Sequence, residues 1–216
     1  MDIRPLVSQI LSDSRIGLPS LADEQSIVLQ FQAYIDLFCK WNKRINLSAD
    51  RDPVTLVTRH VFDSLLYSRA LDGRGEIVDV GSGAGFPGIP LKLVFPDYSF
   101  VLVEAQRKRV SFLQEVIRQL KLTDIEVVQC RAEDLPPIYK ERFQYVIFKA
   151  VAPIRDCLAW GAPLLAPGGR IIVKKEPQES SSSVPSFPGL QESPSIAIHN
   201  YSGVASQLTI FQKCST

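Results

Sequence analysis

The chain has 216 residues, 45% of them hydrophobic, which is enough for one sizeable core and a small extension. Lysine and arginine number 24 against 23 aspartate and glutamate residues, so the net charge gives no sign of a nucleic-acid-binding protein. Any polyanionic partner must therefore meet a local basic patch.

The first 72 residues show a helical pattern. Apolar side chains recur at intervals of three and four residues between Ile27 and Trp41. A second helix is expected to start near Pro53, whose fixed φ suits a first turn, and to end near Gly73. The sequence therefore predicts an N-terminal helical extension over residues 1–72.

From Glu76 onwards, short β-rich runs alternate with helical segments. The runs are 76–81, 100–105, 125–130, 145–150 and 170–175. Their apolar character and the lengths between them predict an α/β domain over 73–216, with a parallel sheet covered on both faces.

The C-terminal part is predicted to contain a loop and a hairpin. The Ser- and Pro-rich segment 176–195 reads as a flexible loop, and the runs 196–202 and 207–214 as two strands of an antiparallel hairpin at the sheet edge. Five parallel strands followed by such a hairpin are more typical of Rossmann-like methyltransferases than of dehydrogenases.

The segment "IVDVGSGAGFPG", 77–88, runs from a strand into a turn with three alternating glycines. Gly81, Gly83 and Gly85 allow the backbone to approach a ligand at the strand end. The dinucleotide fingerprint needs a glycine where this chain has Phe86, and no Gly-Lys-Ser/Thr follows for a P-loop. The pattern that remains resembles the S-adenosylmethionine loop of methyltransferases. A nicotinamide-dependent oxidoreductase is a less favoured alternative.

Acidic residues follow the next two predicted strands. Glu104 ends the second strand, where its carboxylate can accept hydrogen bonds from both ribose hydroxyls, or can instead begin a helix favourably. Ala132 and Glu133 follow the third strand and are placed to contact the adenine edge, although acidic residues often start helices. In series with the glycine turn, these positions favour S-adenosylmethionine as cofactor.

Five segments in order carry a resemblance to one family. They are "WNKRINLS" (41–48), "RHVFDSL" (59–65), "DVGSGAGFPGIPL" (79–91), "KRVSFL" (108–113) and "QCRAED" (129–134). Together they resemble the bacterial GidB/RsmG family, which methylates N7 of a guanine in 16S ribosomal RNA. The resemblance implies that Gly81, Phe86, Ala132 and Glu133 line the cofactor site.

The sequence departs from the family pattern at two places. The family's fourth strand usually ends in Ser-Arg-Ala, whereas this chain has Phe148-Lys149-Ala150 and so lacks the planar fork of arginine. The family usually has an arginine just before the last strand, where this chain has Ser206 and Gln207. These departures leave open a catalytically weakened, cofactor-binding RNA module that assists ribosome assembly. Lys149 is expected to contact RNA or the cofactor carboxylate.

The resemblance also implies contact with 16S ribosomal RNA or the small ribosomal subunit. The basic residues expected at this contact are Lys43, Arg44, Arg131, Lys149 and Lys175. An ordinary solvated helix surface is the competing explanation for such residues. Guanine N7 has a lone pair and no proton, so no general base is expected; the sequence contains no Ser-His-Asp or Cys-His arrangement.

The cysteine pattern and hydropathy bear on the compartment. The four cysteines form no Cys-x-x-Cys pair, so neither a metal nor a redox site is expected. Reduced cysteines, the lack of a membrane-spanning stretch and the lack of a signal-peptide pattern predict a cytoplasmic protein with no membrane partner. We expect it to act as a monomer.

Overall fold

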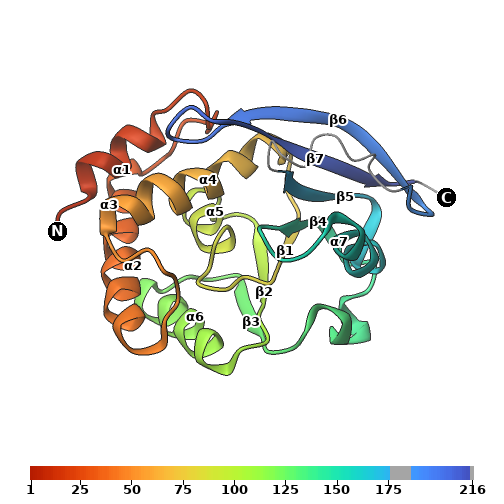
Figure 1. Ribbon diagram of the computed structural model, residues 1–216, viewed down its shortest axis with the longest axis horizontal. Helices are drawn as coiled ribbons and strands as arrows, with labels where there is room; N and C mark the ends of the chain where they lie inside the picture. The colour runs from red at the N-terminus through yellow and green to blue at the C-terminus, as the bar shows by residue number, and fades with distance from the viewer. Residues whose placement is uncertain (176–185, 215–216) are drawn as a thin grey trace.

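A computed structural model of the chain describes residues 1–175 and 186–214, and Figure 1 shows a central sheet flanked by helices. The seven strands lie in the order β3-β2-β1-β4-β5-β7-β6. Their bounds are β1 Glu76–Val80, β2 Ser99–Val103, β3 Ile125–Val128, β4 Phe143–Phe148, β5 Leu165–Lys175, β6 Leu190–His199 and β7 Ala205–Lys213. Strands β1 to β5 are parallel, and β7 is antiparallel to both β5 and β6. The predicted fold class is confirmed.

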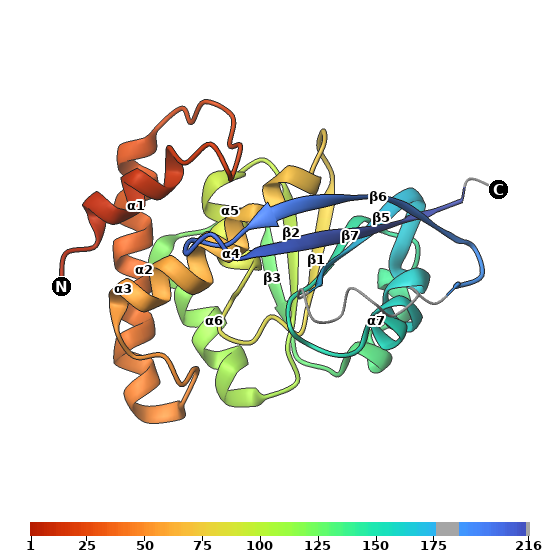
Figure 2. The same ribbon diagram turned by 45° about the horizontal axis from the view of Figure 1, so that its top comes forward.

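Helices lie at both ends of the sheet. Figure 2 shows α1 and α2 on the left and α7 on the right, as in Figure 1. The α-helices are α1 Arg4–Leu11, α2 Glu24–Ile45, α3 Pro53–Thr55, α4 Phe62–Leu65, α5 Gly88–Val94, α6 Arg107–Leu120 and α7 Ile154–Gly161. A π-helix covers Leu56–Val61, and 3₁₀ turns cover Leu66–Ala70, Ala132–Asp134, Pro137–Tyr139 and Ala162–Leu164. Within the described ranges, no helix has both the length and the apolar character needed to cross a membrane.

The helical run that starts at Pro53 begins as the sequence predicts. Asp52 caps it, because its carboxylate accepts a hydrogen bond from the Thr55 N–H at 2.8 Å. The run continues without a break through α3, the π-helix, α4 and a 3₁₀ turn to Ala70. The π-helical segment contains Arg59 and His60, and its extra residue per turn was not predicted from the sequence.

Side chains on the two faces of the sheet enter two different cores. Ile77 and Leu102 belong to the larger core, which also contains Phe31 of α2 and Phe112 of α6. Val78 and its same-face neighbours belong to a smaller core beneath α7. This alternation is the period of two expected for strands buried on both faces. The N-terminal helices therefore share a core with the sheet; the division at residues 72 and 73 stays a prediction.

Strand β6 begins earlier than predicted. It starts at Leu190 and pairs with β7, so residues 190–195 are strand rather than the end of a loop. Its register shifts between Ser193 and Ile196, next to Pro194, because proline has no N–H for the ladder. Residues 186–189 lie in irregular structure and a turn, as predicted, and residues 176–185 of the predicted loop lie outside the described residues.

Helix α2 is tied to the glycine-rich turn by one buried hydrogen bond. The Tyr34 hydroxyl donates to the Ala84 carbonyl oxygen at 2.6 Å, and the Tyr34 side chain is fully buried. Burial also raises the pKa of this hydroxyl well above its usual value. The bond therefore persists as a neutral phenol donating to a carbonyl.

Replacing Tyr34 by phenylalanine removes this donor and leaves the Ala84 carbonyl buried. The free energy of unfolding should fall by about 1–3 kcal/mol in urea denaturation. Tyr201→Phe is the matched control, because the Tyr201 hydroxyl has no hydrogen-bond partner in the described part of the chain. Equal stability losses in the two variants would contradict the assigned role of Tyr34.

Candidate functional site

The turn that follows β1 is held against the end of β2. The Gly81 and Ser82 N–H groups both donate to the Val103 carbonyl, at 2.9 and 3.0 Å. Gly81, Gly83 and Gly85 have φ angles of 77°, 58° and 93°, in the left-handed region that favours glycine. A Cβ on Gly81 would lie 2.8 Å from the Val151 side chain. Both the backbone conformation and the packing therefore require glycine at position 81.

A cleft of about 630 Å³ opens at the carboxyl ends of β1, β2 and β3. This is the edge at which open α/β sheets bind ligands. Of the residues predicted for the cofactor, the structure brings Gly81, Glu104, Ala132 and Glu133 together here, and Arg131 also lines the cleft. Gly83 and Gly85 do not line the cleft: the Gly83 N–H donates to the cleft residue Glu104, and Gly85 packs against Ile89.

Glu104 is the most constrained polar side chain of the cleft. It is 6% exposed, and its Oε2 accepts a hydrogen bond from the Gly83 N–H at 2.9 Å. Its Oε1 accepts from the Gln106 N–H at 2.7 Å, and Arg109 Nη1 lies 4.0 Å from Oε2. Each carboxylate oxygen can accept a further hydrogen bond. The fixed carboxylate is therefore suited to a ligand that presents two neighbouring hydroxyls.

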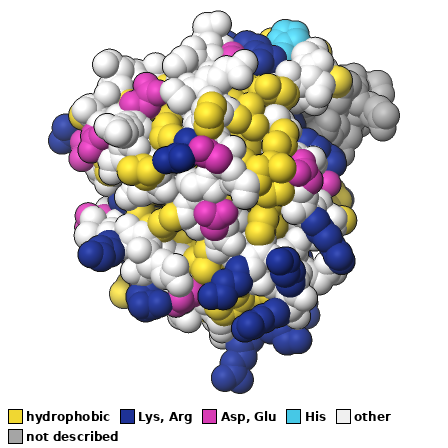
Figure 3. Space-filling view, turned by 90° about the vertical axis from the view of Figure 1, so that its left-hand side faces the viewer, with side chains coloured by type: hydrophobic (Ala, Val, Ile, Leu, Met, Phe, Trp, Pro, Cys, Tyr) yellow, Lys and Arg dark blue, Asp and Glu magenta, His cyan; other side chains and the backbone are white. Residues whose placement is uncertain are grey.

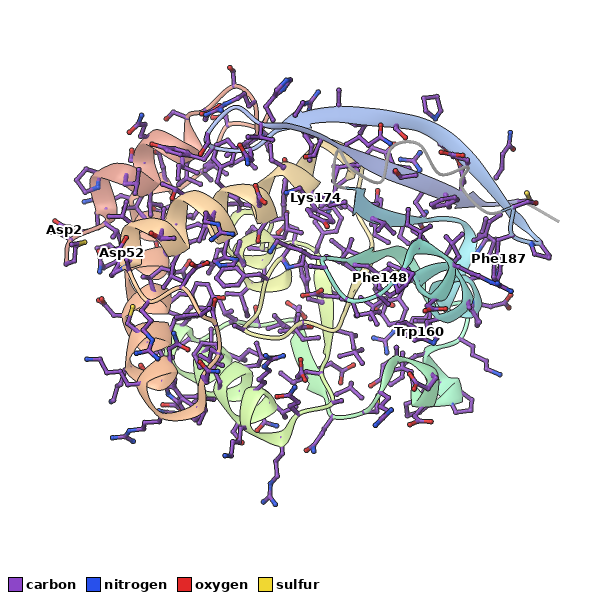
Figure 4. All side chains as sticks on the ribbon, in the orientation of Figure 1. Asp2, Asp52, Phe148, Trp160, Lys174 and Phe187 are labelled. Atoms are coloured by element: carbon purple, nitrogen blue, oxygen red, sulfur yellow. The ribbon has the colours of Figure 1, made fainter. Side chains whose placement is uncertain are left out.

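Among the cleft residues that were not predicted, three have large side chains or come from elements not expected at the site. Arg109 comes from the first turn of α6, Val151 follows β4, and Trp160 comes from α7. Figure 4 labels Trp160 below α7. Nothing in the sequence around Trp160 indicated a site, because a tryptophan on an amphipathic helix reads as a core residue. The structure shows a half-buried indole that gives the cleft an aromatic wall.

The structure does not bring Phe86 into the cleft. Its side chain is 9% exposed and packs in an aromatic cluster between α2 and the π-helix. Its ring centroid lies 5.1 Å from that of His60, in a stacked arrangement, and 5.6 and 5.9 Å from those of Tyr34 and Phe38. The nonpolar ring gains more from this burial than from the edge of an open cleft. Phe86 thus connects the glycine turn to the N-terminal helices.

Lys149 lies beside the cleft rather than in it. It lines a second cavity of about 250 Å³ with Asp63 of α4 and Lys174 of β5, hereafter the inner cavity. Its Nζ lies 5.8 Å from the Phe86 ring centroid. Burial lowers the pKa of the Lys149 ammonium, and the nearby Asp63 carboxylate partly opposes this shift. Ala150 and Val151 line both the cleft and the inner cavity.

Basic side chains gather on the face formed by α2 and α6. Lys43 and Arg44, predicted for RNA, are exposed at the end of α2, and Arg107 and Lys108 are exposed at the start of α6. Figure 3 shows lysine and arginine concentrated toward the lower end of this face. Within the described residues, none of these four makes an ion pair. The side chain of Lys175, at the end of β5, lies outside the described part.

Three comparisons with known proteins agree with this geometry. The family model described as "rRNA small subunit methyltransferase G" matches residues 27–184. A ribosomal RNA small subunit methyltransferase G from Yersinia enterocolitica is 40% identical over 182 residues, covering 83% of this chain and 84% of that protein.

The fold is also similar to solved methyltransferase structures. A SAM-dependent methyltransferase from Aquifex aeolicus aligns with a TM-score of 0.55 and 16% identity, over 75% of this chain and 94% of that one. TrmN from Thermus thermophilus aligns with a TM-score of 0.58 and 17% identity, over 80% of this chain but only 53% of that longer protein. At these identities, the two structures support the fold alone.

Asp79 underlies the whole turn and gives it a pH dependence. The residue is fully buried, its Oδ2 accepts from the Gly88 N–H at 3.0 Å, and its Oδ1 has no partner in the described ranges. Burial raises the pKa of this carboxyl to about 7, although the Gly88 hydrogen bond opposes the shift. Between about pH 4 and pH 7, Asp79 is therefore protonated in the folded protein and ionised in the unfolded chain.

The stability contributed by this proton is fully present below about pH 4 and is lost as the pH rises to about 7. The side chain of Asp79→Asn does not titrate, so this variant should not lose that stability. The free energy of unfolding of the wild type should therefore fall relative to that of the variant between about pH 4 and pH 7, by at most about 4 kcal/mol. Urea denaturation of both proteins at pH 5 and pH 8 measures the difference. A gap that is the same at the two pH values would show that Asp79 is ionised in the folded protein throughout.

Proposed function

This chain belongs to the GidB family of rRNA small subunit methyltransferases, and on that premise we propose that it transfers a methyl group from S-adenosylmethionine to N7 of a guanine in 16S ribosomal RNA. The buried Glu104 carboxylate, which lines the cleft and is fixed by two backbone N–H groups, is the observation that carries the proposal. Each of the two carboxylate oxygens can accept a further hydrogen bond, and two ribose hydroxyls are suitable donors.

The residues of the cleft fit S-adenosylmethionine in other respects. Gly81 and Gly83 bring backbone close to the cleft, while Ala132 and Glu133 lie on the wall beyond β3, where an adenine edge would bind. Trp160 adds an aromatic surface for the heterocycle. When bound, S-adenosylmethionine supplies a methyl group on a positively charged sulfur. The protein's part is to bind the cofactor and to orient it.

The proposed reaction agrees with the chemistry of the surrounding residues. Guanine N7 attacks through an in-plane lone pair and loses no proton, so alignment and electrostatics replace acid–base catalysis. His60 is occupied by a 2.8 Å contact with Asp50 and by its stack on Phe86. It is therefore a structural residue that links the π-helix to the glycine turn.

Ribosomal RNA is proposed to bind across the basic face and the mouth of the cleft. Lys43 and Arg44 of α2 are joined there by Arg107 and Lys108 of α6, and α2 packs against α6. Arg131, exposed at the rim of the cleft, extends this charge toward the site. We propose that the protein acts in the cytoplasm, because a ribosomal RNA substrate is found there. Exposed large hydrophobic residues such as Leu29 and Ile138 are scattered, which supports a monomer.

The methyl mark itself provides the test of the proposal. N7-methylguanosine has a weakened glycosidic bond, so reduction followed by aniline cleaves the RNA at the modified position. We expect cleavage in 16S RNA from wild-type cells, none from a strain without this protein, and restoration by the wild-type gene. Glu104→Gln should restore little cleavage, because S-adenosylhomocysteine affinity measured by calorimetry should fall about 10- to 100-fold. Equal cleavage with and without the protein would exclude the enzyme and leave an assembly role.

The basic face generates a separate prediction. The double variant Lys43→Glu and Arg44→Glu should weaken RNA binding about 10- to 100-fold and make the slope of log K against log salt shallower by about 1 to 2. Lys140→Glu with Arg155→Glu is the matched control, because both residues are exposed on other elements and the charge change is equal. If the two double variants bind RNA alike, only net charge matters and the face has no specific role.

A further inference from the structure

The inner cavity adjoins the cofactor cleft but belongs to different elements. It lies at the carboxyl ends of β4 and β5, is lined also by Asp63 of α4 and by residues of α7, and has a volume of about 250 Å³. Its lining includes the charged residues Asp63, Lys149 and Lys174 and the nonpolar residues Ile154 and Val173. Ala150 and Val151 form a wall common to both spaces. A ligand in the inner cavity would therefore lie next to whatever occupies the cleft.

Asp63 lines this cavity, and one of its two carboxylate oxygens is an unsatisfied acceptor. Its Oδ2 accepts a hydrogen bond from Lys174 Nζ at 2.5 Å, which links α4 to β5. Its Oδ1 is buried and has no hydrogen-bond partner in the described part of the chain. Leaving a charged acceptor unpaired costs more than leaving a neutral one. The arrangement is explained if a ligand donates to Oδ1.

We propose that the inner cavity holds the target guanine and that Asp63 recognises its Watson–Crick edge. This inference rests on the proposed function. Guanine is the base that presents two adjacent donors, N1–H and the N2 amino group, to a carboxylate, whereas adenine presents the lone pair of N1 there. N7 lies on the opposite edge of the purine. A base held by Asp63 therefore keeps N7 free to face the methyl group.

The same carboxylate favours the chemical step. The bond between sulfur and the methyl carbon breaks and leaves its electron pair on sulfur, while the N7 lone pair forms the new bond; no proton moves. The positive charge therefore passes from the sulfonium to the purine ring. A nearby carboxylate stabilises that charge in a site of low dielectric. The cavity also contains Lys149 and Lys174, and Arg59 and the buried Asp79 lie close enough to Lys149 to act on its charge.

Changing the target base tests recognition by Asp63 without changing the protein. Inosine lacks the N2 amino group but retains N7. In 16S RNA with inosine at the position mapped by aniline cleavage, the target base therefore offers Asp63 one donor fewer. Wild-type protein should methylate this RNA with a kcat/KM about 10- to 100-fold below that for guanine. Asp63→Asn should react slowly with both RNAs and lose the preference, to within about 3-fold. Its affinity for S-adenosylhomocysteine should remain unchanged.

The controls distinguish this inference from the proposed function. Asp156→Asn, an exposed carboxylate on α7, should keep the wild-type rate and preference. If the wild-type protein methylates guanine and inosine equally, the role of Asp63 is wrong and the proposed function is unaffected. The same conclusion follows if Asp63→Asn folds and retains the preference for guanine. If Asp63→Asn does not fold, the wild-type comparison with inosine decides alone. Failure of the wild type to methylate any guanine defeats the proposed function itself.

Discussion

The hydrogen bonds that tie the glycine-rich turn to the end of β2 determine where the cleft can form. Two N–H groups of the turn share the Val103 carbonyl, and a third binds the Glu104 carboxylate. These bonds require backbone angles that only glycine adopts easily, and they leave no room for a side chain at Gly81. Because Glu104 is held by the same turn, the conformation of the loop and the position of the carboxylate are a single structural feature. The family motif is thus a packing requirement as well as a binding one.

Most of the fold could be predicted because its signals are local. Apolar runs of strand length, separated by segments of helix length, specify a parallel sheet, and a proline after an aspartate marks the start of the helical run at Pro53. The start of β6 could not be predicted, since residues 190–195 contain Ser and Pro and acquire strand structure only by pairing with β7. Likewise, His60 of the π-helix contacts Asp50 and Phe86, and the local sequence pattern around His60 does not indicate these contacts.

The candidate site was predictable where residues follow strands, and not where they come from helices. Glu104, Ala132 and Glu133 all lie just after a strand of a parallel sheet, and the topology alone brings them to one edge. Trp160 and Asp63 lie on helices, whose rotation relative to the sheet depends on packing. Phe86 occupied a motif position but points into the core, because a nonpolar ring next to Tyr34 and His60 is best buried. Lys149 follows β4 as expected, yet it faces the inner cavity rather than the cleft.

The two edge strands of the sheet, β3 and β6, have features that limit aggregation at high protein concentration. An unpaired edge strand can template another chain and start aggregation. Strand β3, at one edge, is only four residues long. Strand β6, at the other, carries Pro194, which cannot donate to an incoming strand, and a break in register beside it. Within the described residues, neither edge strand offers a long, regular ladder, which disfavours edge-to-edge association of the sheet.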